Sequence, residues 1–290
     1  MTGSETTPDA IKPHPRRTRT WLGLTLLVAA AIVGGGWLGR TPRTDRDWDP
    51  EGAELAWGEV AGDVVTVHNV RNFTWRSPTD VTPRWETRTY RLSQLRHLDF
   101  IMTYWGSPHV CHTMVTFDFG PDGRLCASIE ARREVGEEYS ALRGMFRGYE
   151  LIYVLGDERD LVRLRTRIRP HNDVHLFRLK ATPEVTRTMF LDYIDTANGL
   201  RSRPAWYHSL LTNCSTSIRH HVRRAHIADP WDWRVLANGH ADERLYEFGY
   251  VERDLPLPEL KRRSHINEAA LAADQAPDFS DRIRAGRPGF

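Results

Sequence analysis

The sequence has few cysteines, no large excess of positive or negative charge, and no repeated segments. It has three cysteines (Cys111, Cys126 and Cys214) and no CxxC pair, which excludes the common zinc and dithiol redox motifs. With an odd number, at least one thiol is free. Forty Lys and Arg residues nearly balance 38 Asp and Glu residues, for a net charge of +2, so we expect no nucleic-acid partner. No residue pattern calls for a metal or a cofactor, and no internal repeat indicates a solenoid.

One long apolar run is present, over residues 21–38. It contains no charge, is just long enough to span a bilayer as a helix, and carries Trp21 and Trp37 at its ends. We therefore expect a disordered cytoplasmic tail over residues 1–20 and a single transmembrane helix over residues 21–38, with the rest of the chain in the periplasm. A cleaved signal peptide is the alternative, although no good small-x-small site follows the run. A linker is expected over residues 39–57.

The remaining sequence mixes strand and helix patterns, which predicts an α+β domain over residues 58–255. Two β-rich segments, 110–119 and 125–131, flank Gly120-Pro121-Asp122-Gly123 and predict an antiparallel hairpin. Further strands are expected over 64–70, 148–155 and 174–179, and helices over 90–98, 158–169, 182–198 and 214–225, with one more starting at Trp231. Residues 256–290 are expected to be a tail of low order.

The polar stretch Leu211–Ser217 is the strongest candidate for chemistry. Thr212 or Asn213 can cap the helix that follows, which places Cys214 in its first turn. There the helix dipole favours thiolate over thiol. The alternative is a small, buried, inert cysteine.

A cysteine nucleophile needs an imidazole base and a polar group that orients the imidazole. His112 lies on the first strand of the hairpin and Glu130 on the second, so the set Cys214, His112 and Glu130 would suit a papain-like site, with a small antiparallel sheet packed on the cysteine helix. We expect the Cys214 sulfur within about 4 Å of a His112 nitrogen. Each of these residues also has a purely structural interpretation. The other histidines near these residues, which are His109, His208, His220 and His221, are expected to be loop or helix residues, and a zinc site with Cys214 lacks suitable spacing.

A series of ordered motifs carries a family resemblance. They are Arg71-Asn72-Phe73-Thr74-Trp75, Trp85–Tyr90, Asp99-Phe100, Tyr104–Pro108, His112-Thr113, Phe117-Asp118-Phe119, Ser128–Arg132, Tyr139–Arg147, Asp157–Asp160 and Trp206-Tyr207 to Asn213-Cys214. Together they resemble the N-terminal periplasmic domain of Lnb-type lipoprotein N-acyltransferases, over roughly residues 58–250.

The resemblance implies a circularly permuted papain-like fold of the NlpC type, with Cys214 as nucleophile, His112 as base and Glu130 as third member. Cys214 would take an acyl group from a phospholipid as a thioester and pass it to the N-terminal amine of a lipoprotein. No second apolar run follows the domain, in contrast to acyltransferases of this type, so we also expect that it needs a membrane protein as partner or acts on another amide or ester.

Candidate binding residues are Arg143, Arg147 and Arg159, whose guanidinium groups suit a phosphate, together with Tyr104 and Trp105. Surface ion pairing is the alternative role of the arginines. The sequence thus predicts an inner-membrane thiol enzyme that transfers or hydrolyses an acyl group. A cysteine peptidase or peptidoglycan amidase, and a non-catalytic binding module of the envelope, are the two alternatives.

Overall fold

The computed structural model describes residues 25, 28, 39–169 and 171–290. The predicted membrane anchor, residues 21–38, lies outside the described residues except for Thr25 and Val28. Among the described residues, no helix has both the length and the apolar character that crossing a bilayer requires. The chain divides into Met1–Thr41 and a compact unit, Pro42–Phe290, and the latter is described below.

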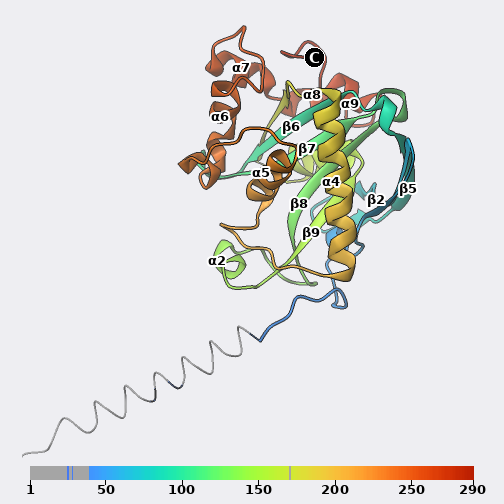
Figure 1. The fold of residues 1–290 in the computed structure, drawn as a ribbon, viewed down its shortest axis with the longest axis vertical. Coiled ribbons are helices and arrows are strands. Elements are labelled where there is room, and N and C mark those ends of the chain that lie inside the picture. Colours follow the sequence, from blue (N-terminus) through green and yellow to red (C-terminus); the bar gives the residue numbers. More distant parts are fainter. Residues whose placement is uncertain (1–24, 26–27, 29–38, 170) are drawn as a thin grey trace, which may run out of the picture. The chain divides into compact units, whose positions relative to one another are not determined.

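A mixed sheet forms the centre of this unit (Figure 1). The strands are β1 (Trp57–Ala61), β2 (Val64–Arg71), β3 (Thr74–Trp75), β4 (Val81–Thr82), β5 (Trp85–Arg91), β6 (His97–Tyr104), β7 (Cys111–Asp118), β8 (Arg124–Arg132), β9 (Glu150–Gly156) and β10 (Asp173–Arg178). The order is β1-β2-β9-β8-β7-β6-β10, with β5 also paired to β2 and with β3 and β4 apart as a small ribbon. Only the β2–β9 pair is parallel among the described strands.

Helices cover both faces of the sheet. They are α2 (Ala141–Gly144), α3 (Glu158–Arg163), α4 (Pro183–Ser202), α5 (Cys214–Arg224), α6 (Ala241–Glu247), α7 (Leu257–Ser264), α8 (Asn267–Ala272) and α9 (Phe279–Arg282). Short helical turns are η1 (Pro50–Gly52), η2 (Leu92–Gln94), η3 (Gly120–Asp122), η4 (Leu164–Ile168), η5 (Trp233–Val235) and η6 (Asn238–His240).

Alternation along the central hairpin decides which residues face which helices. Val115 and Ala127 belong to the core that α4 and α5 share with one face of the sheet. Met114 and Cys126 belong to the core on the opposite face, under α3, α8 and α9. Successive strand residues point to opposite faces, so every neighbour in sequence on β7 and β8 faces a different helical layer.

Several expectations are confirmed. The hairpin over 110–131 forms as β7 and β8, and α4 begins where Thr182 accepts a hydrogen bond from the Val185 N–H. The helix runs past Asn198 to Ser202, because the Asn198 side chain is bonded to both the N–H and the C=O of Gly58 on β1.

Other expectations are wrong. Residues 90–98 form strand, a short turn and strand instead of a helix, and the sheet is larger than the small antiparallel one expected, with one parallel pair. The helix expected from Trp231 is reduced to the short turn η5. The structure is α+β as predicted, while the papain-like arrangement remains a prediction.

The segments expected to be a linker and a loose tail are also part of the fold. Trp48 is nearly buried and forms a bridge to Glu134. At the other end, α7, α8 and α9 pack on the sheet, and Arg284 is buried between the carboxylates of Asp99 and Glu158. The composition of residues 256–290 does not predict these contacts, because the segment is polar and has no long apolar run.

Candidate functional site

Cys214 is the first residue of α5, as the sequence predicts. Asn213 is the N-cap, and it forms a capping box with Thr216: its side chain accepts from the Thr216 N–H at 3.0 Å, and the Thr216 hydroxyl accepts from the Asn213 N–H at 2.9 Å. The thiol therefore lies at the positive end of the helix dipole.

The Cys214 side chain is 6% exposed and lies beside Asn238. Its sulfur is 3.9 Å from the Asn238 Nδ2 and 3.9 Å from the Ser215 Oγ, and these are its hydrogen-bonding contacts within the described chain. Three other atoms fix the Asn238 side chain: it accepts from the Cys111 N–H at 2.9 Å, donates to the Cys111 C=O at 2.7 Å and donates to the Ser215 Oγ at 2.7 Å. This amide ties the start of α5 to the start of β7.

The turn that carries Asn238 is itself held in place. A Cβ on Gly239 would lie 2.2 Å from the Pro108 carbonyl oxygen, so the close approach requires glycine. Tyr104, a predicted binding residue, donates its hydroxyl to the Gly239 C=O at 2.7 Å and accepts from Lys261 at 3.0 Å. Its hydroxyl supports the site wall, and Trp105 is 45% exposed next to it in sequence.

His112 and Glu130 come together on the hairpin, bridged by Ser128. The Ser128 hydroxyl lies 2.7 Å from the His112 Nε2 and donates to the Glu130 Oε1 at 2.6 Å, while Arg165 from η4 donates to that same oxygen at 2.8 Å. The His112 Nε2 and the Glu130 Oε1 are 3.9 Å apart. The two predicted partners are thus joined in one hydrogen-bonded cluster.

Burial and the nearby arginine set the charges of this cluster. Burial, and then the positive charge of Arg165, lower the pKa of His112 to about 3, so the ring is neutral at physiological pH. Burial alone would raise the pKa of the Glu130 carboxyl, but the charge of Arg165 outweighs it and holds this pKa below its ordinary value. The cluster is a neutral imidazole beside a paired carboxylate.

The structure does not bring this cluster to Cys214. Thr113, the next residue after His112, points toward α5, where its hydroxyl lies 3.2 Å from the Ser215 Oγ. His112 therefore points to the opposite face, the one that η4 covers through Arg165. The expected contact of about 4 Å between Cys214 and His112 is absent from the described structure, because the sheet lies between them.

The other predicted residues have separate environments. All three cysteines are free, since Cys111 and Cys126 face opposite sides of the sheet.

The predicted binding arginines lie in different places. Arg143 pairs with Glu137, Arg159 lies in the first turn of α3, and Arg147 has a left-handed backbone with φ of 51°. Arg143 and Arg159 lie on separate elements, α2 and α3.

Two histidine groups on the α5 side escaped sequence analysis. His221, buried on α5, lies 2.6 Å from Asp192 and 2.8 Å from the Tyr153 hydroxyl. Burial lowers its pKa to about 4 despite Asp192. Its i+7 spacing from Cys214 puts both on the buried side of α5, and that spacing was the available signal.

The second group joins the exposed His109 to the half-buried His240. His109 and His240 meet with Nδ1 and Nε2 2.9 Å apart, and the other nitrogen of His240 lies 2.7 Å from Glu243. These residues are 131 positions apart in the chain, so no local pattern could predict the pair. It adjoins the Asn238 turn, two residues from the amide that contacts Cys214.

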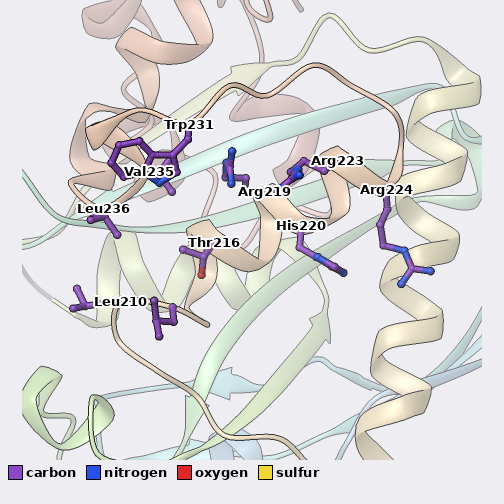
Figure 2. Close-up of a pocket in the computed structure, with 10 residues that line it drawn as sticks. Leu210, Thr216, Arg219, His220, Arg223, Arg224, Trp231, Val235 and Leu236 are labelled. Atoms are coloured by element: carbon purple, nitrogen blue, oxygen red, sulfur yellow. The ribbon is translucent and has the colours of Figure 1, made fainter.

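A groove of about 570 Å³ runs along the outer side of α5 (Figure 2). Leu210, Trp231 and Leu236 line one end, near the start of the helix, and Arg219, His220, Arg223 and Arg224 line the helix itself. Leu211 also lines the groove. We call this the α5 groove. Cys214 lies on the opposite side of the same helix, three residues after Leu211.

Comparison with known proteins gives one match. The family model described as the Lnb N-terminal periplasmic domain matches residues 81–239, a segment that contains His112, Glu130, Cys214 and Asn238. No curated protein and no solved structure matches the chain. The match fits a periplasmic location and a context of lipoprotein processing. Because it covers more than half of the sequence, the chain belongs to the family of Lnb N-terminal periplasmic domains.

Proposed function

We propose that the chain is a periplasmic thiol enzyme that transfers or hydrolyses an acyl group through a thioester on Cys214. The observation that carries the proposal is the setting of the thiol: the first residue of a capped helix, beside a fixed side-chain amide. The positive end of the helix dipole lies at this position, and helix starts offer N–H groups without intrahelical acceptors. The family match supports lipoproteins as the substrate context.

The chemistry follows from these groups. The Cys214 sulfur attacks the carbonyl carbon of an ester, a C–S bond forms, the C–O bond breaks, and the alcohol leaves with the proton that the thiol gave up. An amine or water then attacks the thioester carbonyl. A C–N or C–O bond forms, the C–S bond breaks, and the proton that the amine or water loses restores the thiol. The N–H groups of Cys214 and Ser215, at the start of α5, are the donors available for the oxyanion.

His112 and Glu130 have no direct part in this scheme, because they occupy the other face of the sheet. The imidazoles on the Cys214 side that suit proton transfer are His240, which ends the turn η6 that begins at Asn238, and His109, which precedes β7 and contacts His240. The Glu243 carboxylate orients the His240 ring.

Intact-mass measurement tests the proposal. After incubation with a phospholipid or an activated acyl ester, the wild-type chain should gain one acyl mass that maps to Cys214. Cys214→Ser should gain none, and Cys126→Ser, a matched change at a buried thiol on the other face, should behave like wild type. Absence of any adduct, or an equal adduct in Cys214→Ser, contradicts the proposal.

One observation favours a second candidate, a non-catalytic binding module. No imidazole contacts the Cys214 sulfur among the described residues. If this candidate is correct, Cys214 will react with iodoacetamide at neutral pH no faster than an unperturbed thiol, and His240→Ala will leave that rate unchanged.

A further inference from the structure

The α5 groove combines an apolar end with a cationic wall. At the apolar end the side chains are unusually exposed for their type: Leu211 is 72% exposed and Trp231 is 64% exposed. Leu210 and Leu236 add to the same end. Exposed leucine and tryptophan beside each other mark a surface that meets a partner or a lipid interface.

The cationic wall comes from one stripe of α5. Arg219 and His220 follow Thr216 by three and four residues and precede Arg223 by four and three, which places these residues on one side of a helix. This stripe is opposite to the buried side with Cys214 and His221. The arginines therefore line the groove (Figure 2).

The wall keeps positive charge that the fold does not neutralise. Arg219 forms an ion pair with Asp229, but Asp229 also pairs with Arg244. Arg224 forms an ion pair with Asp192, but Asp192 also contacts His221. Arg223 is exposed and has no ion pair or side-chain hydrogen bond within the described chain. The groove is thus short of negative charge.

We propose that the α5 groove docks the domain on the surface of a bilayer that contains anionic phospholipids. Trp231 and the leucines would enter the interfacial layer, where tryptophan is favoured, and the arginines would meet the phosphate groups. Charge complementarity selects this occupant: arginine binds phosphate bidentately, and each basic residue near an anionic surface adds to the attraction. The inference concerns a surface and does not depend on the thiol chemistry.

The test uses the full-length chain in bilayer discs, with the Cys214→Ser change, so that the proposed nucleophile is absent. An environment-sensitive fluorophore is attached at Leu236→Cys, and brominated lipids serve as quenchers. Cys111 and Cys126 are buried and leave the introduced thiol as the reactive one. We expect quenching in discs that contain phosphatidylglycerol and much less in discs of phosphatidylcholine alone, with loss of quenching at high salt.

Arg223→Glu is the main variant, because Arg223 forms no ion pair with the described residues that the change could break. It reverses one charge and should weaken docking by about tenfold. Arg187→Glu, at an exposed arginine of α4 outside the groove, is the matched control and should dock like the parent chain. Equal quenching in both lipids, no quenching in either, or equal loss in both variants overturns the proposal. A protein or a single free amphiphile as the true occupant would give the first or the second of these results.

Discussion

Arg284 is the residue whose removal we expect to destabilise the fold most. Its guanidinium donates to Asp99 at 2.9 and 2.7 Å, to Glu158 at 2.7 and 2.6 Å, and to the Ser280 C=O at 2.6 Å. Asp99 keeps Arg178 as a second partner, but Glu158 has no other ion pair among the described residues. Arg284→Met would leave a carboxylate uncompensated in the interior.

Breaking a buried pair by removing one partner costs about 3–5 kcal/mol. Because whole domains have about 5–15 kcal/mol of stability, this loss is large enough to leave the variant partly unfolded. Guanidinium chloride unfolding, followed by tryptophan fluorescence, measures the free energy of unfolding. Arg282→Met is the matched control: its ion pair with Asp278 is exposed, and its loss should cost under about 1 kcal/mol.

The pH dependence provides a second check. In the wild type, burial would raise the pKa of Glu158, but Arg284 outweighs burial and lowers it, so this contribution to stability weakens as the pH falls. In Arg284→Met, the main charge that opposes burial is gone and the pKa of Glu158 rises, so lower pH protonates Glu158 and relieves the variant. The difference between the two proteins should therefore shrink in mild acid. A loss below about 1 kcal/mol at neutral pH, or a difference that grows in acid, would refute the reasoning.

Three further predictions follow from the site. His112→Ala should change the alkylation rate of Cys214 by less than about twofold, because the sheet separates the two side chains. A large drop in this rate would show that His112 acts on the Cys214 thiol. His221 should stay neutral until the pH nears its pKa of about 4, so its share of stability is complete above about 6.5 and is lost as the pH falls toward 4, which NMR titration and unfolding of His221→Asn can check. Under oxidising conditions without reductant, intact mass should show no bridge between Cys111 and Cys126, since they face opposite sides of the sheet; a loss of two hydrogens on this pair would contradict the register.

Local signals in the sequence predicted the elements around the site well. Asn213 and Thr216 identify the start of α5, Thr182-Pro183 the start of α4, and the turn at Gly120 the hairpin. Even the shared face of His112, Ser128 and Glu130 follows from strand alternation. These features depend on residues a few positions apart.

The sequence could not show which face of the hairpin α5 would cover. That choice is made by contacts such as Thr113 with Ser215 and Cys111 with Asn238, 102 and 127 positions apart. This choice decides the role of His112, because neighbouring residues on a strand face opposite sides of the sheet. If α5 covered the other face, His112 would point toward it in place of Thr113. Similarly, residues 256–290 looked loose because the stabilising partners of Arg284 lie on β6 and α3.

The buried Arg71 has a consequence for the order in which the chain can fold. Its guanidinium is bound by Asp160, 89 positions later, and Trp75 and the Phe73 N–H share that same carboxylate. Until Asp160 is available, strands β1, β2 and β5 can form a meander but cannot bury this arginine without a counterion. Burial of Arg71 on the early strands therefore requires the middle of the chain. In the same way, burial of Asp99 requires Arg284, near the C-terminal end. Long-range requirements of this kind slow folding.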